Sequence, residues 1–194
     1  VQNLGRTQMR NGFIIDDHEE KKFLLSREAL VSPTVQQEEI RKVFAKCWIY
    51  VGHDSEIREK GDFVTRRVAG RPIIFCRDMN GEAQCFFNTC RHRGAIVCSE
   101  HKGNKRSFRC VYHGWSYLND GTLAGVPGSD AYADTFDKNT LGLKSPARFE
   151  SYRGFHFLCL DANAPSLEDY LGRAKDYMDI VLDQSPSGNM EILS

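Results

Sequence analysis

Two short segments of the chain each combine a cysteine with a histidine. Together they read C-x-H-x17-C-x2-H, with Cys90, His92, Cys110 and His113 at the fixed positions, and each segment ends in a glycine. Thiolate sulfur and imidazole nitrogen are both ligands of transition metals. Because each segment offers one of each kind, the sequence predicts two loops that close on a metal centre.

Three interpretations compete for this pattern. Structural zinc accepts two Cys and two His, but zinc fingers usually pair Cys with Cys, and His with His on a following helix. A Rieske [2Fe-2S] centre holds one iron with two thiolates and the other with two imidazoles, which one Cys and one His per loop supply. The third interpretation is an accidental meeting of buried side chains. The matched halves favour the Rieske centre, and zinc and accident stay open.

Short runs typical of β-strands surround both segments. Asn80-Gly81 and Asp120-Gly121 are strong hairpin signals, and Arg153-Gly154 is expected to form a further turn. Many short strands separated by turn residues predict a mostly β fold, an antiparallel sandwich or barrel. The expected strands are 48–52, 63–68, 73–77, 84–88, 107–111, 115–118, 147–152 and 155–160.

Helical patterns flank this β region. Residues 1–33 are expected to form an extended arm, and Thr34 with Gln37 has the spacing of a capping box at the start of a helix. A second helix is expected from Pro165-Ser166, and residues 190–193 are expected to begin a strand. The second helix carries an apolar stripe at helical spacing, formed by Leu167, Tyr170, Leu171, Ala174, Tyr177, Met178 and Val181. This stripe predicts packing on the domain's own sheet, with a docking face for another domain or subunit as the alternative.

Composition excludes several classes of function. The chain has 194 residues with 26 basic and 26 acidic side chains, so its net charge is 0 and no basic excess points to nucleic acid. No apolar run approaches the roughly 18 residues of a membrane span. Seven cysteines, an odd number, are typical of a reducing compartment. No signal stretch is seen, so we expect a cytoplasmic location; the start at Val1 predicts a trimmed N-terminus.

The two metal-binding segments resemble those of the Rieske ring-hydroxylating oxygenases, in the large (α) subunit. The similarity extends beyond them to 48–53, 87–90, 147–154 and 183–186, and covers about residues 15–194. Respiratory Rieske proteins have an extra cysteine in each loop, joined as a disulfide. Ala95 and Tyr112 stand at those places here, which fits an oxygenase-type centre in a reducing compartment.

The resemblance implies a domain organisation and a set of ligands. It implies an N-terminal arm and helix over 1–47, a Rieske-type antiparallel β domain over 48–164, and a linking helix and the start of an α+β catalytic domain over 165–194, with the rest absent from this chain. Cys90 and Cys110 are expected on the ferric iron and His92 and His113 on the reducible one. Trp115 is expected to shield the cluster from water.

The resemblance also implies partners and chemistry for a complete subunit. A reductase or ferredoxin supplies electrons that come from NADH, and a mononuclear non-heme Fe(II), held by two His and one carboxylate beyond residue 194, activates O2 to hydroxylate an aromatic ring. Relatives assemble as α3 or α3β3, with β subunits and neighbouring α subunits. The C-terminal segment is most similar to the benzoate, toluate and anthranilate branch, so we expect an aromatic carboxylate substrate; neutral aromatic hydrocarbons are the alternative.

Two other classes of protein stay open, and several residues are expected to take no part. A freestanding Rieske-type ferredoxin would carry electrons only, and a zinc-stapled binding module would have no redox activity. Arg91 and Arg93 are expected either to meet an acidic partner or to be solvated, and the basic run 101–106 is expected to be a solvated loop. Structural or surface roles are expected for His18, His53, His101 and His156, and core positions for Cys47, Cys76, Cys85 and Cys159.

Overall fold

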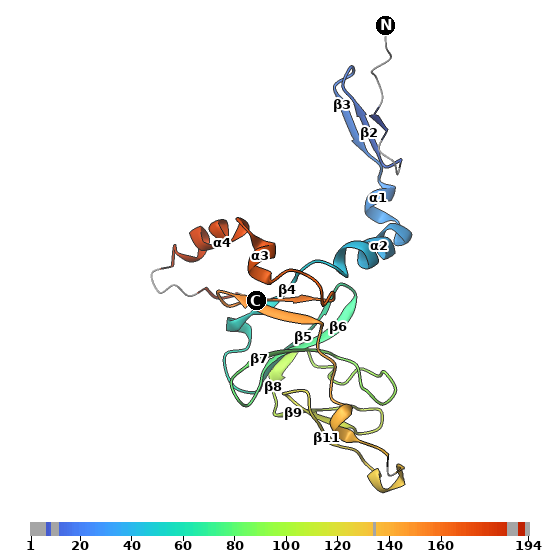
Figure 1. The fold of residues 1–194 in the computed structure, drawn as a ribbon, viewed down its shortest axis with the longest axis vertical. Coiled ribbons are helices and arrows are strands. Elements are labelled where there is room, and N and C mark those ends of the chain that lie inside the picture. The colour runs from blue at the N-terminus through green and yellow to red at the C-terminus, as the bar shows by residue number, and fades with distance from the viewer. Residues whose placement is uncertain (1–6, 9–11, 134, 186–189, 193–194) are drawn as a thin grey trace. The chain divides into compact units, whose positions relative to one another are not determined.

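A computed structural model describes residues 7–8, 12–133, 135–185 and 190–192. The chain divides into two compact units, Val1–Phe44 and Ala45–Ser194, and each is described here by itself (Figure 1). Within the described residues, no helix is both long and apolar enough to cross a bilayer.

The first unit is a small antiparallel sheet followed by short helices. Strands β1 (Thr7–Gln8), β2 (Ile14–Asp17) and β3 (Lys22–Leu25) pair in that order. Helices α1 (Glu28–Val31) and α2 (Pro33–Glu39) follow, and a π-helical turn, η1 (Ile40–Phe44), ends the unit. The expectation of an extended arm over 1–33 is therefore wrong for 14–31, where a hairpin and a helix form.

The helix expected to begin at Thr34 begins one residue earlier. Pro33 occupies its first turn and Ser32 precedes it, without a hydrogen bond from a capping side chain. Proline fits a first turn because its φ is already helical and its missing N–H has no intrahelical partner there. The capping box predicted from Thr34 and Gln37 is therefore wrong.

The second unit consists of three antiparallel sheets, which confirms the mostly β prediction. A four-stranded sheet has the order β7-β6-β5-β8, and two three-stranded sheets have the orders β12-β13-β4 and β11-β10-β9. The strands are β4 (Ile49–His53), β5 (Asp62–Val68), β6 (Arg71–Arg77), β7 (Ala83–Phe87), β8 (Lys102–Asn104), β9 (Ser107–Arg109), β10 (Ser116–Leu118), β11 (Leu123–Gly125), β12 (Arg148–Tyr152) and β13 (Phe155–Cys159). Three 3-10 turns complete it, η2 (Asp54–Glu56), η3 (Ser129–Ala131) and η4 (Lys138–Thr140).

The predicted turns lie where their sequences require them. Asn80-Gly81 joins β6 to β7, and Asp120-Gly121 joins β10 to β11. Between β12 and β13, Arg153 and Gly154 have φ of 47° and 85°. Two successive positive φ values are typical of the two-residue turn whose twist matches paired strands, and glycine adopts them at low cost.

The four-stranded sheet is buried on both faces because its strands alternate between two apolar clusters. In β6, Ile74 and Cys76 belong to one cluster, with Phe63, Phe108 and Tyr117. Their neighbours Ile73 and Phe75 belong to the other cluster, with residues of β4 and β13. Successive side chains of a strand point to opposite faces, so one strand can line two cores.

Three cysteines outside the two loops lie in apolar clusters, as predicted: Cys76 and Cys85 in the two above, and Cys159 in a third with Trp48 and Leu167. Cys76, Cys85 and Cys159 are at most 2% exposed, whereas Cys47 is only half-buried. Burial raises the pKa of Cys85 to about 12. A thiol this weakly acidic is unreactive at neutral pH, so these residues act as small apolar side chains.

The single C-terminal helix expected from Pro165 is two helices. Helix α3 (Leu167–Leu171) ends at Gly172, whose φ is 49°, and α4 (Ala174–Leu182) follows. Leu167 is buried, but Tyr170 and Tyr177 are 47% and 69% exposed. Packing of the whole stripe on the sheet is therefore wrong, because the break at Gly172 changes the phase of the apolar positions. The strand expected at 190–193 does not form over 190–192, and residue 193 lies outside the described residues.

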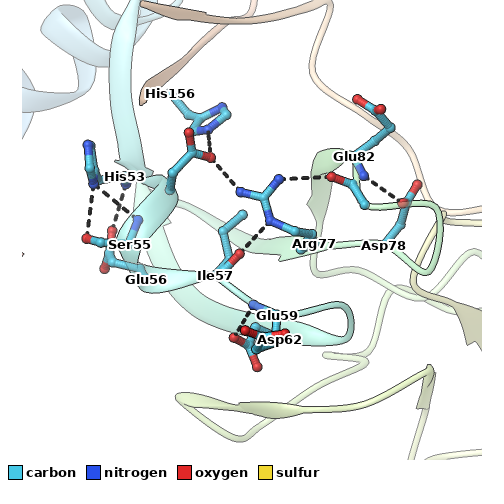
Figure 2. A network of polar contacts seen from close by, with 12 residues as sticks. His53, Ser55, Glu56, Ile57, Glu59, Asp62, Arg77, Asp78, Glu82 and His156 are labelled. Carbon is cyan, nitrogen blue, oxygen red and sulfur yellow. Dashed lines mark hydrogen bonds and ion pairs between the residues drawn. The ribbon is translucent and has the colours of Figure 1, made fainter. Parts of the chain in front are cut away.

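A partly buried polar network joins β4, η2, β6 and β13 (Figure 2). Asp54 Oδ1 accepts hydrogen bonds from His156 Nε2 at 2.9 Å and from Arg77 Nη2 at 2.6 Å. Arg77 also donates to the carbonyl oxygens of Ile57 and Gly81. Burial opposes ionisation of Asp54, but the bonds from His156 and Arg77 outweigh it and lower the pKa of this carboxyl.

Replacing His156 by glutamine is expected to flatten the pH dependence of the unfolding free energy on the acid side of neutrality. Burial lowers the pKa of His156 in the folded protein despite the neighbouring carboxylate, so the unfolded chain binds the proton more readily. Native stability is therefore lost as the pH falls through the unfolded value of about 6.5. Denaturant unfolding between about pH 5 and pH 7 measures the slope. Exposed His101, replaced in the same way, is the control, and a native slope in His156→Gln would contradict the assignment.

Candidate metal centre

The two predicted metal-binding segments form loops of the same construction. In each, the N–H of the cysteine donates to the carbonyl of the residue five positions on, at 2.8 Å in both: Cys90 to Ala95 and Cys110 to Trp115. In each, the glycine four positions on donates back to the cysteine carbonyl, at 2.9 Å and 3.0 Å. The backbone of each cysteine is therefore held by the same pair of hydrogen bonds in both loops.

Strands of two sheets hold these loops. The first loop follows β7, at the edge of the four-stranded sheet, and the second joins β9 to β10 (Figure 1). Cys90 and Cys110 are 4% and 2% exposed and lie in the same apolar cluster. The thiols are therefore fixed in the core, beneath the surface of the domain.

The histidines lie further out and close together. The ring centroids of His92 and His113 are 4.6 Å apart; His92 is half-buried and His113 is exposed. Both rings follow a buried cysteine, so the structure brings all four predicted ligands into one region, the thiols inside and the imidazoles toward the surface.

The donor set fits an iron–sulfur cluster. The Nδ1 atom of His92 is buried and has no hydrogen-bond partner among the described residues. Buried polar atoms normally have a partner, and a metal bound at this nitrogen would supply one. No three His, Cys, Asp or Glu side chains converge on a single point in the part of the chain that the structure describes. A [2Fe-2S] cluster does not require such convergence, because each iron takes only two protein ligands.

Trp115 covers one face of His92. The indole and imidazole rings are nearly parallel, with an interplanar angle of 7° and centroids 4.9 Å apart. Trp115 is 3% exposed, and the rings of Tyr132 and Phe136 pack against it. The side chain predicted as a shield thus lies directly against a predicted ligand.

Tyr117 is a site residue that the sequence reading missed. Its hydroxyl lies 3.2 Å from Cys90 Sγ and accepts a hydrogen bond from the N–H of Arg91 at 3.0 Å. Because a metal-bound thiolate can only accept, the hydroxyl would donate its hydrogen to the sulfur once Cys90 binds a metal. Burial and the contact with Cys90 raise the pKa of Tyr117 well above its usual value. The available signal was its place on β10, two residues after Trp115, since alternate residues of an extended chain point to the same side.

Asn88 ties the first loop to the end of β7. Its side-chain oxygen accepts from the N–H groups of Val97 and Cys98 at 3.0 Å and 2.9 Å, and its amide donates to the Cys98 carbonyl at 2.7 Å. At 3% exposure, Asn88 satisfies three buried backbone groups. Residues 88–98 are thereby closed into one loop that includes Cys90 and His92.

Replacing Asn88 by alanine is expected to lower the unfolding free energy by about 2–4 kcal/mol, because it leaves buried backbone groups without partners. The loosened loop should also release iron faster to a chelator. Denaturant unfolding and the rate of iron loss measure the two effects. Asn163, which is exposed, serves as the alanine control. Unchanged stability and unchanged iron release in Asn88→Ala would show that the loop does not depend on these bonds.

The remaining histidines have structural or surface positions, as predicted. His53 and His156 are buried in the polar network around Asp54, and His18 lies 3.5 Å from Asp16. His101 is exposed. Cys98 is buried, with its backbone held by Asn88. None of these side chains joins the four predicted ligands.

Comparison with known proteins agrees with this geometry. Residues 47–145 match the Rieske [2Fe-2S] domain family, and the chain belongs to that family. The cofactor predicted above, a Rieske [2Fe-2S] cluster, is the group by which this family is defined.

Individual relatives indicate which proteins contain such a domain. The chain is 42% identical over 88% of its length to the anthranilate 1,2-dioxygenase large subunit of Acinetobacter baylyi, and 38% identical over 94% to the toluate 1,2-dioxygenase α subunit of Pseudomonas putida. It spans 36% and 41% of those proteins. A crystal structure of naphthalene 1,2-dioxygenase from Rhodococcus sp. is 44% identical to the chain, with a TM-score of 0.79. The match covers 84% of the chain and 37% of the dioxygenase chain. These relatives confirm the predicted resemblance to oxygenase α subunits.

Proposed function

We propose that Cys90 and Cys110 hold one iron of a Rieske [2Fe-2S] cluster and that His92 and His113 hold the other. The observation that carries this assignment is the equal hydrogen bonding of the two loops, each with one thiol and one imidazole. When bound, the cluster takes up and releases one electron, at a higher potential than an all-thiolate cluster, because neutral imidazoles replace two negative ligands.

The surrounding side chains have separate tasks in this proposal. Asn88 and the backbone bonds of the loops fix the positions of the ligands. Tyr117 donates a hydrogen bond to the sulfur of Cys90, and Trp115 keeps water from one face of His92. His113, the exposed ligand, is the point at which an electron enters or leaves the domain.

We further propose that the chain is the electron-transfer part of an aromatic-ring-hydroxylating oxygenase α subunit. An N-terminal segment over 1–47 precedes the Rieske domain at 48–164, and 165–194 lead into a catalytic domain. The division of the chain after Phe44 supports the first boundary. The complete subunit takes electrons from a reductase or ferredoxin, holds a mononuclear Fe(II), and assembles with neighbouring α subunits and with β subunits. The seven cysteines, none of which forms a disulfide, support a cytoplasmic location.

An aromatic carboxylate is the proposed substrate class. The anthranilate and toluate dioxygenase subunits support it, being 42% and 38% identical to the chain. Neutral aromatic hydrocarbons are the second candidate, favoured by the naphthalene dioxygenase structure at 44% identity. The residues that select the substrate belong to the catalytic part of such enzymes, so the choice requires an experiment.

The experiment expresses the complete reading frame with its partner subunit and its reductase, and measures NADH-dependent O2 uptake with benzoate, anthranilate, toluate, naphthalene and biphenyl. Uptake coupled to hydroxylated product is expected with the carboxylates. Faster turnover of the hydrocarbons would move the protein to the second candidate. Electron uptake without oxygenation of any compound would contradict an oxygenase and indicate a freestanding Rieske-type ferredoxin.

A further inference from the structure

A hollow of about 510 Å³ lies against the first metal-binding loop. Residues 89–94 form one side of it, and the beginning of β6 and the end of β7 form the other. Its lining includes four basic side chains and no acidic one: Arg71, Arg91, Arg93 and Lys144. The hollow therefore has a strongly positive local charge beside the proposed ligands.

None of these four side chains forms an ion pair with a described residue. Arg71 lies over the ring of Phe87, 5.7 Å from its centroid, and the buried Nε of Arg91 has no hydrogen-bond partner in the described part of the chain. Several other arginines of the second unit form ion pairs, among them Arg66 with Glu56, Arg77 with Asp54 and Arg148 with Glu150. Arg67, Arg106 and Arg109 form none with a described residue, but they do not line this hollow.

The gathering of four unpaired cations around one hollow matters because the chain as a whole is neutral. With 26 basic and 26 acidic residues, it has enough carboxylates to pair every cation. Four unpaired cations around one hollow repel each other and are costly to desolvate unless an anion approaches. The missing counter-charges are therefore expected on a partner.

We infer that this hollow receives the carboxylates of an acidic electron-donor protein. The inference rests on the proposed function, because a donor must bring its redox group close to the loop of Cys90 and His92, which forms one wall of the hollow. Complementary charge raises the rate of encounter and sets orientation, and redox encounters bury little surface and bind weakly. Because the four cations are spread over the hollow, several carboxylates on a protein surface can pair with them, whereas one small anion would reach only some of them.

A second basic surface provides a matched control. Lys102 is exposed on β8, at the opposite edge of the four-stranded sheet from β7, and it does not line the hollow. Its replacement by glutamate changes the net charge as much as Lys144→Glu does. Arg71 and Lys144 are the test positions, because neither lies within a metal-binding loop.

The test measures association of the cluster-loaded protein with a plant-type [2Fe-2S] ferredoxin of strongly acidic surface, by stopped-flow at low and high salt. Arg71→Glu with Lys144→Glu is expected to slow association about tenfold or more at low salt and to remove most of the salt dependence. Lys144→Glu alone should have an intermediate effect, and Lys102→Glu a small one. Inorganic phosphate is titrated in parallel as the small-anion probe.

Each outcome decides between clear alternatives. Equal slowing of association by Lys102→Glu and Lys144→Glu would show that only the net charge of the protein matters. An unchanged association rate in the double variant would exclude the hollow as the docking site. Either result overturns the inference. Tight phosphate binding that the double variant abolishes, with ferredoxin association unchanged, would make the hollow a small-anion site instead. In all three cases the native protein and the variants are expected to give a normal Rieske EPR spectrum. If the native protein gave no such spectrum, the proposed function itself would be refuted.

Discussion

Replacing Cys110 by alanine is expected to remove the iron–sulfur cluster. The proposed centre holds each iron by only two side chains, so the loss of one thiolate leaves that iron with a single protein ligand. Iron content should fall from about two per chain to near zero, and the EPR signal of the reduced protein should disappear. The same result is expected for alanine at Cys90, His92 or His113.

Cys98→Ala is the matched control for this experiment. Cys98 is buried in the same apolar cluster as Cys90 and Cys110, but it lies outside the two equally bonded segments 90–95 and 110–115. The variant should keep its iron and its EPR signal. If Cys98→Ala lost the cluster and Cys110→Ala kept it, the ligand assignment would be wrong.

Replacing Tyr117 by phenylalanine is expected to lower the reduction potential of the cluster. The hydroxyl lies 3.2 Å from Cys90 Sγ, and a hydrogen bond to sulfur stabilises the reduced state, which has the greater negative charge. A bond of about 1.5 kcal/mol between a hydroxyl and a charged acceptor corresponds to roughly 60 mV for one electron. Potentiometric titration followed by EPR measures the shift.

Tyr132→Phe is the control for Tyr117→Phe. Its ring contacts Trp115 and Phe136, so the change removes a hydroxyl near the site without removing a bond to sulfur. The control should keep the native potential. Equal potentials in native protein and Tyr117→Phe, with both clusters fully loaded, would show that the hydroxyl does not act on the cluster.

The sequence makes the four candidate ligands visible because their chemistry is local. A thiol and an imidazole two or three positions apart, followed by glycine, define one loop, and the second such loop makes chance unlikely as an explanation. The hairpins are predicted for a similar reason: Asn80-Gly81 and Asp120-Gly121 determine a turn through their own backbone preferences. The strands between them follow from short apolar runs.

The residues that support the ligands depend on contacts that local pattern does not contain. Tyr117 reaches Cys90 across 27 positions, and Asn88 binds Val97 and Cys98 only after the loop has folded. An asparagine or tyrosine at these places reads as an ordinary turn or core residue. Their roles become visible only when separate strands have been brought together.

The errors at the helices have a physical cause of the same kind. Thr34 and Gln37 have the spacing of a capping box, yet Pro33 starts the helix because its backbone already has the required φ. The apolar spacing predicts one continuous helix through Gly172, but the positive φ of this residue separates α3 from α4. In both places the backbone preference of a single residue determines where the helix begins or ends, and it overrides a side-chain pattern that extends over several residues.

The most direct test of the central claim is the metal content of the native protein together with the EPR spectrum after reduction by dithionite. About two irons per chain and a Rieske-type signal are the predicted result, since two thiols and two imidazoles hold one [2Fe-2S] cluster. Zinc in place of iron, with no signal on reduction, would contradict it and would make the two loops a structural staple.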